Sequence, residues 1–306
     1  MYVTPTPLAA YRDLVALDVP FRPGAPAAQD PAGTVRALLA DLVADGTAAA
    51  AGLTAAAIAS RAPDAVTARR LLASLLTVRP ARAWSPEVLA RTDGLLAAEA
   101  ADRPVVEPAA LPLIGAAHPH SEYPAADRTA LWRGDITKLG VDAVVNAAND
   151  RLLGCFVPGH HCVDNALHSA AGPRLREDCA RIMALLGTSE TTGTAKITRG
   201  YHLPARYVLH TVGPIVRGEP GRAEAQLLAR SYLSCLDLAA EAGARTLAFC
   251  SVSTGVFGYP GPAAARIALE TVATWSQAHP NGLDLVVFDV FAEADHATYT
   301  RILKDW

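Results

Sequence analysis

The two halves of the chain differ in the spacing of their hydrophobic and polar positions. Up to about residue 125, Ala and Leu recur at helical spacing in segments separated by Pro and Gly, which predicts a small all-α region. The expected helices are Thr34–Asp45, Thr54–Arg61, Asp64–Leu76 and Pro86–Ala101. An extended run around Pro104–Pro112 follows them, and the polar, Pro-containing segment His118–Asp127 predicts a linker or a wrap-around connection.

After residue 128, short apolar runs of strand-forming residues alternate with helical patterns. The expected strands are Ala130–Trp132, Ala143–Asn146, Thr194–Thr198, Tyr207–Val212, Thr246–Ser251 and Asp284–Phe291. The expected helices are Val163–Ala171, Pro173–Leu186, Ala223–Ala242, Pro262–His279 and Ala294–Leu303. This alternation predicts a three-layer α/β domain, in which ligands bind beyond the carboxyl ends of the strands. We therefore expect a helical extension over residues 1–125 and an α/β domain over residues 126–306.

Composition and charge exclude several classes of protein. Of 306 residues, 51% are hydrophobic and 19% charged, so the chain is expected to fold around a sizeable core. No apolar run approaches the roughly 20 residues of a spanning helix, and Met1–Leu14 lacks a secretory pattern, which favours a soluble, cytoplasmic protein with no membrane partner. A net charge of −3 without a basic run argues against nucleic acid as a partner. The odd number of cysteines, five, argues against a disulfide framework.

Potential metal ligands are concentrated in Gly154–His168 (GCFVPGHHCVDNALH). Cys155, His160 and Cys162 lie within eight residues, in a C-x4-H-x-C arrangement. Zinc favours thiolate and imidazole ligands, and three protein ligands leave a fourth position open, as in catalytic zinc sites. His161 is a further candidate ligand. The alternative is two buried cysteines with incidental surface histidines.

Two other segments consist of turn and loop residues, and the second of them suits a phosphate. Arg133–Thr137 (RGDIT) precedes a predicted strand that ends in Val145–Asn149 (VNAAN), although each alone is also ordinary turn chemistry. Ser251–Pro260 (SVSTGVFGYP) lies between a strand and a helix. There, glycines let backbone amides approach a phosphate, and the helix N-terminus favours anions. A weakly acidic protein can bind a diphosphate in this way without a lysine cluster.

The remaining cysteines and one histidine are expected to be structural. Cys179, Cys235 and Cys250 lie on apolar faces, where a free cysteine packs as a small hydrophobe. His210, in the segment HTVGP, is expected to be a packed, hydrogen-bonded histidine rather than a catalytic one. Phe291 ends the last predicted strand and either covers the edge of the crevice or closes the core.

Taken together and in this order, the motifs resemble those of macrodomains, the ADP-ribose-binding family. The GDIT, VNAAN and STGVFGYP segments are similar to family motifs, and Thr192–Thr198 and His210–Pro214 look like its G-x-A and H-x-V-G-P strands. Val163–Asp164 and Leu167–His168 match the pattern after the family's glycine-rich loop, with Leu where Ile is common. Here a Cys/His segment replaces those glycines, which resembles the zinc-dependent subclass of microbial protein-ADP-ribose hydrolases. The resemblance implies an α/β macrodomain, a three-layer α/β/α sandwich, with an N-terminal all-α extension.

The resemblance also implies an activity: zinc-dependent removal of mono-ADP-ribose from protein side chains, with Asp or Glu linkage as first choice. It implies Zn²⁺ on Cys155, His160 and Cys162, Asp164 as general base or water-orienting group, and Asn149 as a catalytic residue that orients the distal ribose. The substrate-binding residues that it implies are Asp135 and Ile136 at the adenine, and Asn149, Val163, Ser253, Thr254, Gly255, Val256, Phe257, Gly258 and Tyr259 around the rest of ADP-ribose.

Alternatives remain for both the activity and one residue. One alternative activity is that of a non-catalytic ADP-ribose reader with a structural zinc. The other is hydrolysis of a small derivative such as O-acetyl-ADP-ribose or ADP-ribose 1″-phosphate. The alternative role for Asp164 is that of the N-cap of the following helix. The expected partners are a mono-ADP-ribosylated protein and the product ADP-ribose.

Overall fold

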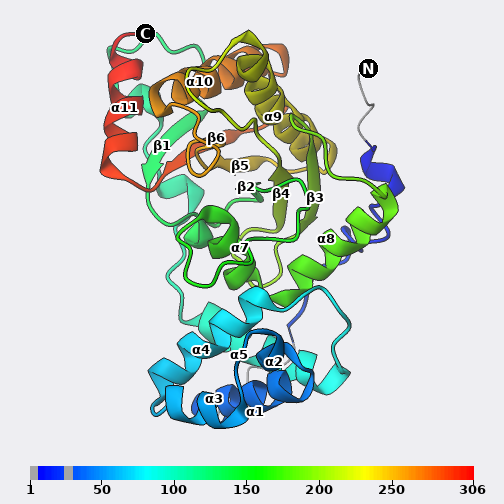
Figure 1. Ribbon diagram of the computed structural model, residues 1–306. Coiled ribbons are helices and arrows are strands. Elements are labelled where there is room, and N and C mark those ends of the chain that lie inside the picture. The colour runs from blue at the N-terminus through cyan, green and yellow to red at the C-terminus, as the bar shows by residue number, and fades with distance from the viewer. Residues whose placement is uncertain (1–5, 24–29) are drawn as a thin grey trace.

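A six-stranded sheet forms the centre of the computed structural model, which describes residues 6–23 and 30–306 (Figure 1). The strands are β1 (Thr129–Arg133), β2 (Ala143–Ala147), β3 (Ala195–Arg199), β4 (Tyr207–Thr211), β5 (Thr246–Phe249) and β6 (Leu285–Val290). Their order is β1-β6-β5-β2-β4-β3, and only the β3–β4 pair is antiparallel. The parallel strands are almost wholly apolar because layers of helices bury both faces of the sheet.

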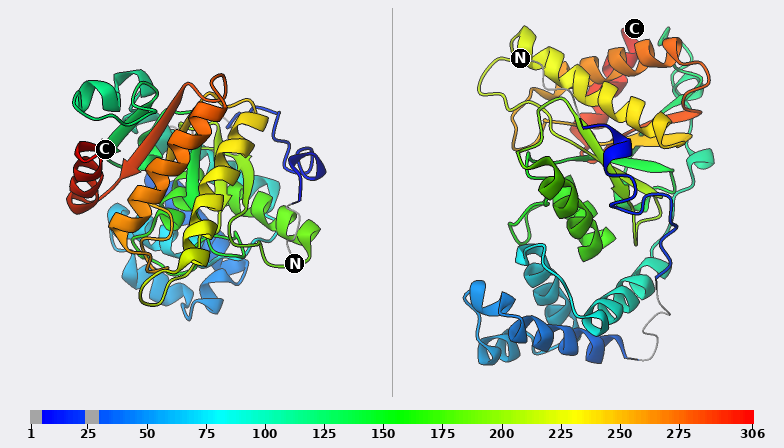
Figure 2. Two further views of the ribbon diagram at one scale, coloured as in Figure 1. Left: turned by 90° about the horizontal axis from the view of Figure 1, so that it is seen from above. Right: turned by 90° about the vertical axis from the view of Figure 1, so that its right-hand side faces the viewer.

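Helices cover both faces of this sheet. On one face α9 (Arg222–Glu241) and α10 (Gly261–Ala278) lie side by side, and on the other lie α7 (Val163–Ala171) and α8 (Pro173–Leu186) (Figures 1 and 2). The last helix, α11 (Glu293–Lys304), packs against β1, β6 and α10. The expected three-layer α/β class is confirmed.

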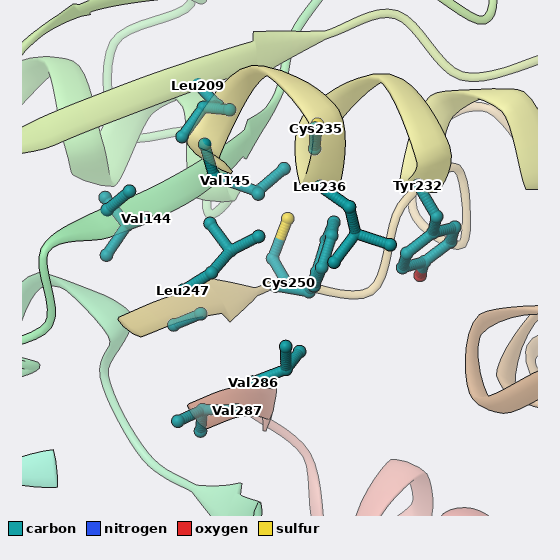
Figure 3. Packing of buried hydrophobic residues seen from close by; sticks show 14 of the residues in the cluster. Val144, Val145, Leu209, Tyr232, Cys235, Leu236, Leu247, Cys250, Val286 and Val287 are labelled. Atoms are coloured by element: carbon teal, nitrogen blue, oxygen red, sulfur yellow. The ribbon is translucent and has the colours of Figure 1, made fainter. Parts of the chain in front are cut away.

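The main hydrophobic core lies between the sheet and the helices that cover it. In Figure 3, Val145, Leu209 and Leu247 of three neighbouring strands point toward Cys235 and Leu236 of α9. All five side chains are fully buried, as is Cys179, and Cys250 is buried as well. The expectation that the last three cysteines pack in the interior is confirmed.

A second cluster of helices precedes the sheet and lies beside α7 (Figure 1). These helices are α1 (Pro31–Ala44), α2 (Thr47–Ala50), α3 (Ala55–Arg61), α4 (Ala65–Val78) and α5 (Pro86–Ala101). The four longer ones each begin at a side chain that caps a backbone amide, as short polar N-cap residues do. These caps are Asp30, Thr54, Asp64 and Ser85. Buried apolar residues of α1, α3, α4 and α5 form a core separate from the one under the sheet.

Two segments outside the helical cluster pack against the sheet and its helices. The hydroxyl oxygen of the buried Tyr11 accepts a hydrogen bond from the amide of Ile197 in β3 (3.2 Å). Tyr123, within His118–Asp127, is buried and donates to the carbonyl of Leu269 in α10 (3.0 Å). His118–Asp127 is therefore a packed, wrap-around connection.

Most expected elements are confirmed to within a few residues at their ends. The expected helices Pro86–Ala101, Val163–Ala171 and Pro173–Leu186 match the observed bounds. The short elements were not expected, because three or four residues carry no periodic pattern. They are α2 and α6 (Ile114–Ala117), and the 3-10 turns η1 (Leu8–Ala10), η2 (Pro108–Ala110) and η3 (Ile136–Lys138).

No helix within residues 6–23 and 30–306 has both the length and the apolar character needed to cross a bilayer. The expectation about a secretory signal rests on Met1–Leu14, and the first five of those residues lie outside the described part of the chain.

We predict that Leu72→Ala lowers the free energy of unfolding by about 2–5 kcal/mol, because Leu72 of α4 is fully buried in the core of the helical cluster. The matched control is Val66→Ala on the same helix, where the side chain is 61% exposed and the expected change is under about 0.5 kcal/mol. Urea denaturation measures both. Equal losses in the two variants would contradict the assigned burial.

Candidate functional site

The candidate residues lie where the parallel strands end. Asp135 follows β1, Asn149 follows β2, and Ser251–Pro260 follows β5. Because β1, β6, β5 and β2 are parallel neighbours, their carboxyl ends share one edge of the sheet. Motifs that are far apart in the sequence therefore converge at the edge where α/β sheets bind ligands.

Between β2 and α7, one loop brings Cys155, His160 and Cys162 together. Cys155 Sγ lies 3.4 Å from His160 Nδ1, and one ligand atom of each residue lies within 4.8 Å of the others. Gly154 enters this loop with a φ of +87°, and a Cβ there would lie 3.0 Å from the His168 ring. Glycine is therefore required at the entry to the loop. The neighbouring His161 is exposed and lies outside this group.

The donor set of this group fits zinc. Two sulfurs and one imidazole, all half-buried, are the ligands that zinc prefers over harder cations. Burial raises the pKa of Cys162 to about 11, although its Sγ accepts a hydrogen bond from the Asn165 amide (3.4 Å). At neutral pH such a thiol keeps its proton, and binding of a metal ion displaces that proton. The Cys/His group is thus able to hold a metal ion.

The first turn of α7 carries both Cys162 and Asp164. Cys162 is the N-cap residue, so the alternative that Asp164 is the N-cap is wrong. Asp164 is 5% exposed, and its Oδ1 accepts a hydrogen bond from Asn146 Nδ2 (2.8 Å). Burial raises the pKa of Asp164 to about 6, and this hydrogen bond opposes the shift. His168 Nε2 lies 3.5 Å from the carboxylate, but burial lowers the pKa of His168 well below its usual value, so the ring is neutral.

Asn146 of β2 holds the Asp164 carboxylate, and His210 of β4 in turn holds the Asn146 side chain. Asn146 Nδ2 lies 3.1 Å from His210 Nδ1, and His210 Nε2 lies 3.0 Å from Thr198 Oγ1. Burial lowers the pKa of His210 to about 3, so this ring is also neutral. Because an amide nitrogen only donates, Nδ1 accepts and Nε2–H donates to Thr198. His210 is the packed, hydrogen-bonded histidine expected. Sequence reasoning missed Asn146, whose signal is a polar residue inside an apolar strand.

Asn149 contacts the start of the loop that carries the Cys/His group, which we call the Cys/His loop (residues 153–162). Its Nδ2 donates to the carbonyl of Gly154 (3.2 Å), and its Oδ1 accepts from the amide of Arg151 (3.0 Å). The side chain is half-buried. Val163, the first residue of α7, is also half-buried and follows Cys162 directly. Both residues therefore flank the Cys/His group at its two ends.

The loop after β5 is held in a tight turn. Ser253 is buried with a φ of +66°, and Gly258 has a φ of +72°. A Cβ on Gly258 would lie 2.8 Å from the Val216 carbonyl oxygen, so only glycine fits this position. The amide of Tyr259 donates to the carbonyl of Ser253 (3.0 Å) and closes the turn.

This turn presents backbone donors at the edge of the sheet. Among residues 6–23 and 30–306, the amides of Gly255, Val256 and Phe257 have no hydrogen-bond acceptor. Gly255 and Val256 are exposed, while Phe257 packs partly on the chain that leaves β2. Thr254 Oγ1 donates to the Ser251 carbonyl (3.0 Å) and stiffens the turn. Adjacent unpaired amides of this kind suit an anion.

Asp135 and Asp289 lie together at the other end of the strand edge. Asp135 Oδ1 accepts from both the amide (3.0 Å) and the hydroxyl (2.7 Å) of Thr137, and Ile136 beside it is buried. Asp289 of β6 is 6% exposed, and burial together with the nearby Asp135 raises its pKa to about 8. Sequence reasoning missed Asp289, whose signal is an acidic residue inside an apolar strand. Phe291 is 83% exposed, so it does not close the core.

Comparison with known proteins identifies a family for these motifs. A family model described as the Macro domain matches residues 145–268. A protein-ADP-ribose hydrolase of Treponema medium is 46% identical over 234 residues, which cover 76% of this chain and 87% of that protein. A protein-ADP-ribose hydrolase of Staphylococcus aureus (strain MRSA252) is 48% identical over 174 residues, which cover 56% of this chain and 65% of that protein.

Solved structures show the same fold. The Trypanosoma brucei macrodomain in complex with ADP-ribose has a TM-score of 0.57 at 35% identity, with 75% of this chain and 94% of that chain covered. The Oceanobacillus iheyensis macrodomain with ADP has a TM-score of 0.53 at 40% identity, with 58% and 92% covered. The expected macrodomain fold with its helical N-terminal region is confirmed.

We predict that Asp289→Asn stabilises the protein by an amount that grows between about pH 4 and pH 8 and is constant above. The folded carboxyl keeps its proton up to about pH 8, whereas an unfolded one loses it near pH 4. Wild-type stability therefore falls as pH rises through this window, and the Asn variant lacks that fall. Chemical denaturation at several pH values measures the difference, with Asp13→Asn, at an exposed site, as control. A difference independent of pH would contradict the raised pKa.

Proposed function

The chain belongs to the Macro domain family, and we propose that it hydrolyses the bond between mono-ADP-ribose and a protein side chain. The observation that carries this proposal is the buried carboxylate of Asp164 beside the Cys155, His160 and Cys162 group. Relatives named as protein-ADP-ribose hydrolases support the same reaction. In this proposal residues 126–306 form the ADP-ribose-binding macrodomain, and residues 1–125 form its helical extension.

Backbone donors and a side-chain acceptor along the strand edge would bind ADP-ribose. Asp135 accepts a hydrogen bond from the adenine amino group, because its Oδ2 is not used by Thr137, and the Ile136 backbone lies beside it. The diphosphate binds the unpaired amides of the loop from Ser253 to Tyr259, where a short turn concentrates several donors without a lysine cluster.

The distal ribose would then lie between Phe257 and the Cys/His loop. Phe257 packs against one side of it, and Asn149 binds its hydroxyls from the start of the loop. Val163 completes the wall at the start of α7. This placement sets the bond to the modified protein beside Asp164, at the open edge of the sheet.

Cys155, His160 and Cys162 would hold Zn²⁺. When bound, the ion supplies Lewis acidity toward a ribose or ester oxygen, or acidifies a water molecule. Asp164 orients the attacking water and accepts its proton. Its Oδ1 is engaged by Asn146, and its Oδ2 has no partner within the described residues, so Oδ2 is the atom that faces the water.

We propose first that the bond hydrolysed is an ester between ADP-ribose and an Asp or Glu side chain of the target protein. Hydrolysis of such an ester yields free ADP-ribose and the restored carboxylate of the target protein. The partners are thus a mono-ADP-ribosylated protein and the product ADP-ribose.

The direct test is release of ADP-ribose from a protein mono-ADP-ribosylated on acidic residues, with and without a zinc chelator. We expect chelation to abolish turnover and added zinc to restore it. ADP-ribose binding without release would favour a reader instead. Cleavage of O-acetyl-ADP-ribose alone would favour a small-molecule hydrolase.

Two adjacent histidines provide the matched variants for this assay. His160→Ala is expected to lose bound zinc and turnover, because it removes a member of the Cys/His group. His161→Ala is expected to retain both, since its side chain is exposed and outside the group. Zinc content by elemental analysis accompanies the rates. Equal behaviour of the two variants would exclude the Cys/His group as the metal site.

We also predict that Asp164→Ala slows turnover about 10²–10⁴-fold, the usual range for removing a general base, while ADP-ribose binding is retained. Calorimetric titration with ADP-ribose and single-turnover release measure the two effects separately. Unchanged turnover would remove Asp164 from the mechanism.

A further inference from the structure

The C-terminal end of α4, in the helical extension, contacts the Cys/His loop through two residues. Arg176 of α8 joins the end of α4 to Leu153, two positions before Cys155. Asn165 of α7 joins the end of α4 to His160. These contacts join segments about 80–100 residues apart in sequence. The helical extension therefore reaches the loop near both ends of the ligand set.

Arg176 forms the stronger connection. Its Nη1 donates to the carbonyls of Leu76 (3.0 Å) and Arg79 (2.6 Å), at the end of α4, and its Nε donates to the carbonyl of Leu153 (2.7 Å). The Phe156 ring lies 4.5 Å from the guanidinium carbon. Arg176 is 7% exposed. Burial lowers the pKa of Arg176, and the nearby Asp164 carboxylate opposes this shift. Helix-terminal carbonyls, an aromatic face and this carboxylate therefore stabilise its charge.

Asn165 forms the second connection. Its side-chain Nδ2 donates to the carbonyl of His160 (3.0 Å), and its backbone amide donates to Cys162 Sγ (3.4 Å). Oγ1 of Thr77, the penultimate residue of α4, lies 3.5 Å from Asn165 Oδ1. Asn165 thus contacts two of the candidate ligand residues, His160 through its side chain and Cys162 through its backbone amide, and its side chain also faces the helical extension.

The C-terminal end of α4 is itself fixed to the other helices of its cluster through Arg79. Arg79, its C-cap residue, is 4% exposed, binds Asp45 (2.8 Å) and stacks on Trp84 at 3.6 Å. The carbonyls that Arg176 uses therefore belong to a rigid part of the helical cluster. The loop from Cys155 to Cys162, by contrast, contains no helix or strand, and Phe156 and Val157 in it are exposed.

We propose that Arg176 is a positioning residue: it uses the end of α4 as a fixed support that holds the Cys/His loop in its ligand-ready arrangement. The helical extension then acts on the metal loop directly, in addition to packing beside α7. The identity of the metal in this proposal rests on the proposed function. The ordering of the loop by Arg176 does not depend on it. Groups that orient metal ligands from outside the coordination shell typically change metal affinity about 10–100-fold.

Arg174 provides a matched control on the same helix. It also joins α8 to the helical extension, through hydrogen bonds to Asp93 of α5 (2.6 and 2.9 Å). Unlike Arg176, it makes no contact with the Cys/His loop within the described residues. Arg174→Gln therefore weakens the connection between the two regions without touching the loop, whereas Arg176→Gln does both.

The test compares full-length wild type, Arg176→Gln and Arg174→Gln in two measurements. Zinc affinity is measured by competition with a chromogenic chelator, and amide hydrogen exchange of residues 153–162 is measured in metal-free protein. We expect Arg176→Gln to bind zinc about 10–100-fold more weakly and to exchange faster in this loop. Arg174→Gln is expected to match wild type in both measurements.

If Arg176→Gln does not fold, Arg176→Lys replaces it. A lysine keeps a cation at the end of α4, but one ammonium group cannot reproduce the fork that reaches both α4 and Leu153. We expect melting near that of wild type with a weakened zinc site. Unchanged loop exchange in the Arg176 variants, or an equal effect of Arg174→Gln, would overturn the proposal. If wild type binds no zinc, the metal assignment of the proposed function fails, and loop exchange alone decides the role of Arg176.

Discussion

The hydrogen bond between Asn146 and Asp164 joins the end of β2 to the first turn of α7, and the geometry of the site depends on it. Both side chains are buried, so either one without its partner would leave an unsatisfied polar group in the interior. The neutral His210 ring takes the second amide hydrogen of Asn146 and sets its orientation. Because Cys162 caps the same helical turn, the contact that holds Asp164 also fixes the last candidate ligand of the Cys/His group.

The sheet edge and the cluster of helices α1–α5 thus both support the site. The sheet places Asn149 and the amides after β5 at the ends of parallel strands, where each position follows from strand order. It also holds Asp164 of α7 through the hydrogen bond from Asn146 of β2. The Cys/His loop has no strand hydrogen bonds to hold it. It contacts side chains of α7 and α8 that also face α4. Rigid sheet positions therefore suit recognition of ADP-ribose, while a separately braced loop suits a metal site.

Local patterns were sufficient to predict the fold class and the helices Val163–Ala171 and Pro173–Leu186, whose apolar spacing and Gly or Pro boundaries act within a few residues. The spacing of Cys155, His160 and Cys162 likewise predicted a group that the fold brings together. Long-range pairing is what the sequence pattern does not contain. Arg176 reads as a polar position on an amphipathic helix, and only the folded chain places it against carbonyls nearly 100 residues away.

The most direct measurement of the central claim is a crystal structure with ADP-ribose, with anomalous scattering recorded at the zinc absorption edge. The account predicts adenine at Asp135, diphosphate on the amides of the loop after β5, and one anomalous peak among Cys155, His160 and Cys162 beside the distal ribose. A peak elsewhere, or a distal ribose far from Asp164, would contradict it.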